Sequence, residues 1–105
     1  MKINTYEKIV MNLLNENSES FQTVWTRFLD YYAAKDALEN SNHISFIHAI
    51  YAKEQPRALK HVALPLELHV SERSLYRYRK QYLKCLALMA RQLDFPLDID
   101  TQSLQ

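Results

Sequence analysis

A run of serine, arginine, tyrosine and lysine residues in the C-terminal half of the chain has the side chains needed to recognise a nucleic acid. Residues 71–84 read SERSLYRYRKQYLK. Arg73 and Arg77 are spaced one helical turn apart, and an arginine can donate two hydrogen bonds to O6 and N7 of guanine. Lys80 and Lys84 suit phosphates, because a lysine is a point charge that fixes register without reading sequence. This spacing predicts a surface that binds duplex DNA.

Hydroxyl groups lie at the start of the same run. Ser71 is a strong helix N-cap candidate, since its hydroxyl can accept a hydrogen bond from an amide one turn further on, and Glu72 complements the helix dipole. The hydroxyls of Ser71, Ser74 and Tyr76 could also donate to phosphates or base edges. The predicted DNA-binding residues are therefore Ser71, Arg73, Ser74, Tyr76, Arg77, Lys80 and Lys84.

The helix that carries these residues, predicted over 71–93, has two distinct faces. At about 100° per residue, an apolar seam lies within about 60° of Leu75 and comprises Tyr78, Tyr82, Leu86, Met89 and Leu93. A basic stripe lies opposite, at about 140–200°, and comprises Arg73, Arg77, Lys80, Lys84 and Arg91. Arg79 lies nearer the buried side, so we expect it to snorkel or to pair with a carboxylate.

Charge is unevenly distributed along the chain, although the net charge is only +1. Residues 57–91 contain eight basic and two acidic residues, whereas residues 1–56 contain five basic and seven acidic ones. Asp94, Asp98 and Asp100 make the C-terminal tail acidic. This segregation predicts one basic surface on a neutral or acidic body, although a merely solvated basic face is the plainer interpretation.

The elements around the run predict a helix-turn-helix over residues 61–93. Leu68 and Val70 flank a turn, and two helices held around such a turn place the second helix in the major groove of DNA. His69 occupies the turn position that usually holds glycine, because the backbone there tends toward positive φ. Pro65 is tolerated only in a first turn, so either this helix begins near Val62 or residues 57–64 and 65–69 form separate pieces.

The rest of the chain predicts an all-α fold, a small bundle of about five helices that ends in the helix-turn-helix. Helical periodicity places helices at 5–15, 20–38, 44–53, 57–69 and 71–93, with Pro56 ending the third. Asn4 and Glu7 resemble a capping box for the first helix. Aromatic residues between Phe21 and Tyr32 are expected to be core. We divide the chain into an N-terminal helical pair (1–42), a helix-turn-helix unit (43–95) and a flexible tail (96–105).

Several function classes are disfavoured. The chain has one cysteine and no glycine, which argues against disulfides, cysteine-based zinc sites and phosphate-binding loops. The four histidines are not spaced as a metal-ligand set, and no nucleophile or carboxylate pair stands out. We therefore expect no enzyme activity, no metal and no cofactor. We also expect no signal peptide or membrane span and a cytoplasmic location.

The segment from Leu68 to Lys80, followed by YLKCLALMA over 82–90, resembles the ArpU/RinA-type phage regulators of Gram-positive bacteria. These proteins resemble region 4 of sigma factors, and the likeness covers about residues 44–95. It implies promoter binding that activates late genes of a phage or mobile element, with RNA polymerase or another protein as a further partner. Ser71, Ser74, Tyr76, Arg77 and Lys80 then occupy the positions expected at DNA.

Other functions stay open. A small helical adaptor or antagonist that binds a protein would keep the helix-turn-helix only as a scaffold, and a DNA-packaging small subunit would share the motif but form a ring. Leu83, Ala87 and Leu88 make the end of the last helix more apolar than one face requires. This surplus indicates either a homodimer or burial within the monomer.

Overall fold

The computed structural model describes residues 2–51 and 63–104; most of these are helical and none lies in a strand. The elements are α1 (Lys2–Asn15), α2 (Glu19–Glu39), α3 (His43–Ile50), α5 (Ala63–Leu68), α6 (Glu72–Gln92) and a 3₁₀ helix η1 (Thr101–Leu104). The all-α class and the expected number of about five helices are confirmed. Pro56, the end of the third predicted helix and the first part of the predicted helix at 57–69 lie outside the described residues.

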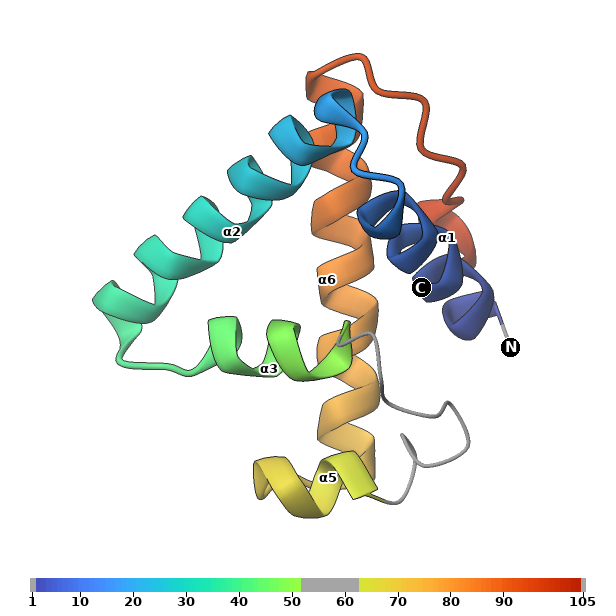
Figure 1. Cartoon of the computed structure of the whole chain (residues 1–105). Helices are drawn as coiled ribbons and strands as arrows, with labels where there is room; N and C mark the ends of the chain where they lie inside the picture. The colour runs from blue at the N-terminus through green and yellow to red at the C-terminus, as the bar shows by residue number, and fades with distance from the viewer. Residues whose placement is uncertain (1, 52–62, 105) are drawn as a thin grey trace.

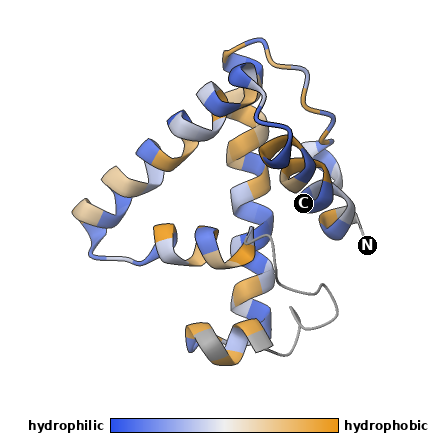
Figure 2. Ribbon diagram, in the orientation of Figure 1, coloured by the Kyte–Doolittle hydropathy of each residue, from blue (hydrophilic) through white to orange (hydrophobic). Residues whose placement is uncertain are grey.

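Helix α6 is the central element of the fold. In Figure 1 it runs the full height of the molecule, with α1 on one side, α2 and α3 on the other, and α5 crossing near its N-terminal end. Its inner face is buried, as the side chains of Leu75, Tyr82 and Leu86 are 2%, 0% and 0% exposed. Figure 2 shows hydrophilic and hydrophobic positions alternating along α6, as expected of an amphipathic helix. The core therefore fixes which face of α6 meets solvent.

The predicted aromatic core of α2 is confirmed. Phe21, Val24, Trp25, Phe28 and Tyr32 are all buried on its inner face. The rings of Tyr32 and Tyr82 meet edge to face with centroids 5.1 Å apart, an arrangement that aromatic pairs favour. These contacts hold α2 against α6.

Asp36 joins the end of α2 to the start of α3. Its carboxylate accepts hydrogen bonds from the Ser41 hydroxyl (2.7 Å) and from the backbone N–H groups of His43 and Ile44 (both 2.9 Å). The amide groups at the start of a helix have no partner within the helix, so this carboxylate satisfies two of them. The side chain of Asn42, the residue just before α3, makes no such bond. Asp36 therefore caps α3 from the preceding helix.

The predicted capping box at the start of the first helix is wrong. Helix α1 begins at Lys2, so Asn4 and Glu7 lie inside the helix rather than at its start. Both side chains reach instead to Arg79 on α6. A buried guanidinium offers a carboxylate stronger, charge-assisted hydrogen bonds than a helix-end amide does.

The C-terminal segment packs against the body, which differs from the flexible tail expected over 96–105. Ile99 and Leu104 are 7% and 2% exposed and belong to the same core cluster as α1, α2, α3 and α6. The Tyr6 hydroxyl accepts a hydrogen bond from the backbone N–H of Asp100 (3.3 Å) and lies 3.1 Å from the Ser103 hydroxyl. Two apolar side chains and a tyrosine of α1 thus hold the chain down as far as residue 104.

Candidate nucleic-acid interface

The turn between α5 and α6 is closed by local backbone hydrogen bonds. His69 has φ 58°, so the expectation of a left-handed residue at this position is confirmed. The N–H of His69 donates to the carbonyl of Leu66 (3.3 Å) and the N–H of Val70 to the carbonyl of Pro65 (3.0 Å). This is the paired bonding of a Schellman motif, which needs a left-handed residue after the helix. The chain therefore turns sharply from α5 into α6.

Pro65 is compatible with α5 because of its place in it. It is the third residue of the helix, which is described from Ala63. The N–H groups of a first helical turn have no partner within the helix, so proline removes no hydrogen bond there. Of the two arrangements open from the sequence, a helix that begins close to residue 62 agrees with this position.

Ser71 caps α6 as predicted. Its hydroxyl oxygen accepts a hydrogen bond from the N–H of Ser74 (3.0 Å), and its hydroxyl donates to the Ser74 hydroxyl oxygen (3.0 Å). The Ser71 hydroxyl thus uses its hydrogen within the cap, whereas the Ser74 hydroxyl only accepts there and keeps its own hydrogen. A phosphate that took the Ser71 hydrogen would compete with the bond to Ser74.

The basic stripe lies on the solvent side of α6. Arg73, Arg77 and Arg91 are exposed, and Lys80 and Lys84 are partly exposed. None of these five has an ion-pair partner among the side chains that the structure describes.

Two aromatic rings hold the long basic side chains along the surface of α6. The Lys80 ammonium lies 5.1 Å from the centre of the Tyr76 ring, and the Arg77 guanidinium lies 5.8 Å from that of Tyr78. Cation–π contacts at exposed sites are each worth about 0.5–1 kcal/mol. Tyr76 itself is 47% exposed, so its ring and hydroxyl border the stripe as predicted.

Arg79 is the one basic residue of α6 that points inward. Its Nε donates to Glu7 Oε2 (2.9 Å) and its Nη2 to Glu7 Oε1 (2.7 Å) and Asn4 Oδ1 (2.7 Å). Burial by itself lowers the pKa of Arg79, but the hydrogen bonds and charge of Glu7 outweigh it and raise the pKa. The predicted carboxylate pairing is confirmed, and this pair connects α1 to the helix that carries the stripe.

The predicted set omits one residue of the same face. Gln81 is exposed and lies between Arg77 and Lys84 on the surface of α6. Its place at about 240° from Leu75 on the helical wheel was available from the sequence, but a search for positive charge passes over a neutral amide. Gln81 makes no side-chain hydrogen bond within the described part of the chain.

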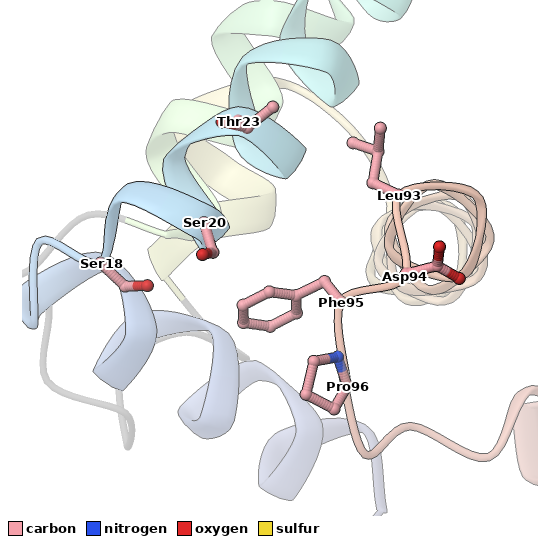
Figure 3. A pocket seen from close by; sticks show the side chains of 7 residues that line it. All are labelled: Ser18, Ser20, Thr23, Leu93, Asp94, Phe95 and Pro96. Atoms are coloured by element: carbon pink, nitrogen blue, oxygen red, sulfur yellow. The ribbon is translucent and has the colours of Figure 1, made fainter.

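One cavity is lined by none of the stripe residues. A pocket of about 400 Å³ lies between the start of α2 and the end of α6, where Phe95 and Pro96 face the serines across it (Figure 3). It is lined by Ser18, Ser20, Thr23, Leu93, Asp94, Phe95 and Pro96. Only Asp94 among them is titratable, and the Ser18 hydroxyl caps α2, so the lining offers no acid–base or nucleophilic pair.

Within the described residues, histidine, cysteine and carboxylate side chains form no group of three that could hold a metal ion. No described helix is both long and apolar enough to cross a membrane. Burial raises the pKa of the Cys85 thiol, which opposes the thiolate form that a nucleophile requires.

Comparison of the chain with models of protein families, with curated proteins and with solved structures finds no match. The resemblance to the ArpU/RinA-type regulators therefore stays a prediction that rests on the residues quoted for it.

Proposed function

We propose that this protein is a sequence-specific DNA-binding transcriptional regulator that places α6 in the major groove of duplex DNA. The observation that carries the proposal is the basic stripe, which runs along one solvent-facing side of a rigidly packed helix and has no ion-pair partner among the described residues. DNA carries one negative charge per ~1.7 Å of duplex axis, so a line of unpaired cations along a helix suits it.

The elements next to the stripe support the same function. Helix α5 and the sharp turn at His69 precede the capped start of α6, in the order that a helix-turn-helix requires. The buried contact between Arg79 and Glu7 fixes the rotation of α6, so its outer face is preorganised. The resemblance to phage regulators implies a biological role for this binding, namely activation of late genes at a promoter.

Titration of labelled genomic duplex fragments with the purified protein, at about 50 and 200 mM salt, tests the proposal. We expect a dissociation constant in the micromolar range or tighter that weakens steeply with salt, because each phosphate contact releases counterions. The variant Arg73→Ala/Arg77→Ala/Lys80→Ala should lose most of the affinity, and the slope of log K against log salt should become shallower by about one unit for each phosphate contact that is removed.

A matched control distinguishes the stripe from net charge. Lys8, Arg27 and Lys35 lie on α1 and α2, so Lys8→Ala/Arg27→Ala/Lys35→Ala removes the same charge elsewhere. Binding should survive in this control. Equal loss in both triple variants, or no binding by the wild type at low salt, would overturn the proposal.

A protein-binding module is the second candidate, and one observation favours it. Tyr31 and Leu38, seven residues apart on α2 and therefore on one face, are 47% and 88% exposed. Exposed apolar side chains that cluster are typical of protein contacts. This candidate predicts that Leu38→Lys abolishes capture of a partner from host extract, whereas the triple variant of the stripe does not.

A further inference from the structure

Four residues of α6 have the spacing of a groove-reading face. Arg77, Lys80, Gln81 and Lys84 follow one another at i, i+3, i+4 and i+7, which aligns them on one side of a helix. Three of them are cationic, and Gln81 is the neutral one. Its carboxamide combines an acceptor and two donors and is unengaged in the described part of the chain.

The first turn of α6 is less suited to contact bases. The Ser71 hydroxyl both donates and accepts within the cap, and the Ser74 hydroxyl oxygen accepts its hydrogen. Glu72 is exposed at the first helical position, where its carboxylate would meet the phosphates that line a groove. Like charges in such proximity repel each other. The surface suited to contact bases therefore begins one turn further on, at Arg77, while Arg73 remains suited to a phosphate.

Homeodomains show that a helix can read DNA through this part of its length. Their third helix lies along the major groove and uses four positions with the same i, i+3, i+4, i+7 spacing, the third of which is an asparagine that contacts adenine. Glutamine offers adenine the same pair of hydrogen bonds as asparagine, through N6 and N7. In α6 the third position is Gln81.

We propose that Gln81 is a specificity-determining residue that reads an adenine, with Arg77 reading a guanine nearby; this inference rests on the proposed function. The Gln81 Oε1 accepts from adenine N6 and its Nε2 donates to N7, while Arg77 donates to O6 and N7 of guanine. Four residues of helix rise about 6 Å, which corresponds to about two base-pair steps of ~3.4 Å. The adenine and the guanine consequently lie within about two base pairs of each other.

Selection of bound duplexes from a random library tests this assignment for the wild type, Gln81→Ala and Gln92→Ala. Gln92→Ala is the matched control, because Gln92 is also an exposed glutamine of α6 but lies at its C-terminal end. We expect the wild type and Gln92→Ala to enrich one motif with a fixed adenine. Gln81→Ala should lose the preference at that base pair alone.

Affinities for the selected duplex and for an unrelated duplex complete the test. Gln81→Ala should bind the selected duplex about 5- to 150-fold more weakly, as one bidentate base contact predicts, and the unrelated duplex unchanged. The melting temperature should not change, because Gln81 is exposed.

The outcomes separate this inference from the proposed function. A Gln81→Ala variant that enriches the same adenine overturns the assignment and leaves DNA binding intact. Salt-dependent binding by the wild type without any enriched motif overturns both the assignment and sequence-specific reading. A wild type that binds no duplex overturns the regulator function as a whole.

Discussion

The buried pair between Arg79 and Glu7 makes a quantitative prediction about stability. The two side chains are 3% and 2% exposed, and the two hydrogen bonds between them are 2.9 and 2.7 Å long. The substitution Arg79→Met keeps the volume of the site roughly constant but leaves a buried carboxylate without its counter-charge. Breaking one side of a buried ion pair costs about 3–5 kcal/mol. A domain of this size is stable by about 5–15 kcal/mol, so the variant should lose a large part of its stability.

Urea unfolding followed by circular dichroism measures this loss. A complete cycle uses Arg79→Met, Glu7→Leu and the double variant. Each single substitution leaves one uncompensated buried group, whereas the double variant leaves an apolar contact and should be more stable than Arg79→Met. The losses of unfolding free energy in the two single variants should therefore add up to more than the loss in the double variant.

The ion pair between Lys35 and Glu39 provides the control. It is 3.2 Å long, but its side chains are 36% and 54% exposed, so solvent screens it. Lys35→Met should change the free energy of unfolding little, because exposed ion pairs contribute little to stability. The reasoning fails if Arg79→Met is no more damaging than Lys35→Met, or if the cycle shows no coupling between Arg79 and Glu7.

Three further predictions concern single side chains. Partial burial raises the pKa of Asp36, but hydrogen bonds from Ile44, Ser41 and His43 lower it below its ordinary 3.8. Asp36→Asn should thus lower the free energy of unfolding at pH 7, because an amide has one acceptor oxygen where the carboxylate has two. This gap should close as the pH falls below 3.8 through the folded-state pKa, and urea unfolding that finds it constant from pH 7 to 2 would contradict the role of Asp36. At His69, where φ is 58°, substitution by glycine should raise the free energy of unfolding by up to about 1 kcal/mol, and substitution by valine should lower it. A valine variant that melts above the glycine variant would refute the strained turn. Leu104→Ala should lower the free energy of unfolding by about 2–5 kcal/mol, whereas the exposed control Gln102→Ala should hardly change it. Equal melting temperatures of the two variants would show that the tail contributes no stability.

The two faces of α6 were predictable because helical periodicity is a local property. A repeat of 3.6 residues determines which side chains share a face, whatever the helix packs against. Leu75, Tyr82 and Leu86 are accordingly buried, and Arg73 and Arg77 are exposed. The same holds for the cap at Ser71 and the positive φ at His69, since both depend on neighbouring backbone atoms.

The apolar surplus at the end of α6 shows where local patterns become ambiguous. Leu83 and Ala87 are 0% and 7% exposed within this one chain, and Leu88 alone of the three surplus residues is 52% exposed. Periodicity indicates that a side chain is buried but not which surface buries it. Of the two alternatives open from the sequence, burial within the monomer accounts for Leu83 and Ala87.

Contacts between distant segments were decided by the tertiary structure. Glu7 lies close enough in sequence to Asn4 to resemble a capping box, yet its partner Arg79 is 72 residues away. Ile99 and Leu104 belong to the tail that was expected to be flexible, but both are buried, and the 3₁₀ helix that holds Leu104 contacts α1 and α6. The sequence by itself determined that α6 and its neighbours are helices. It also determined which side chains lie on each face of α6. Only the folded chain decided their partners, because a long-range contact depends on how several helices pack together.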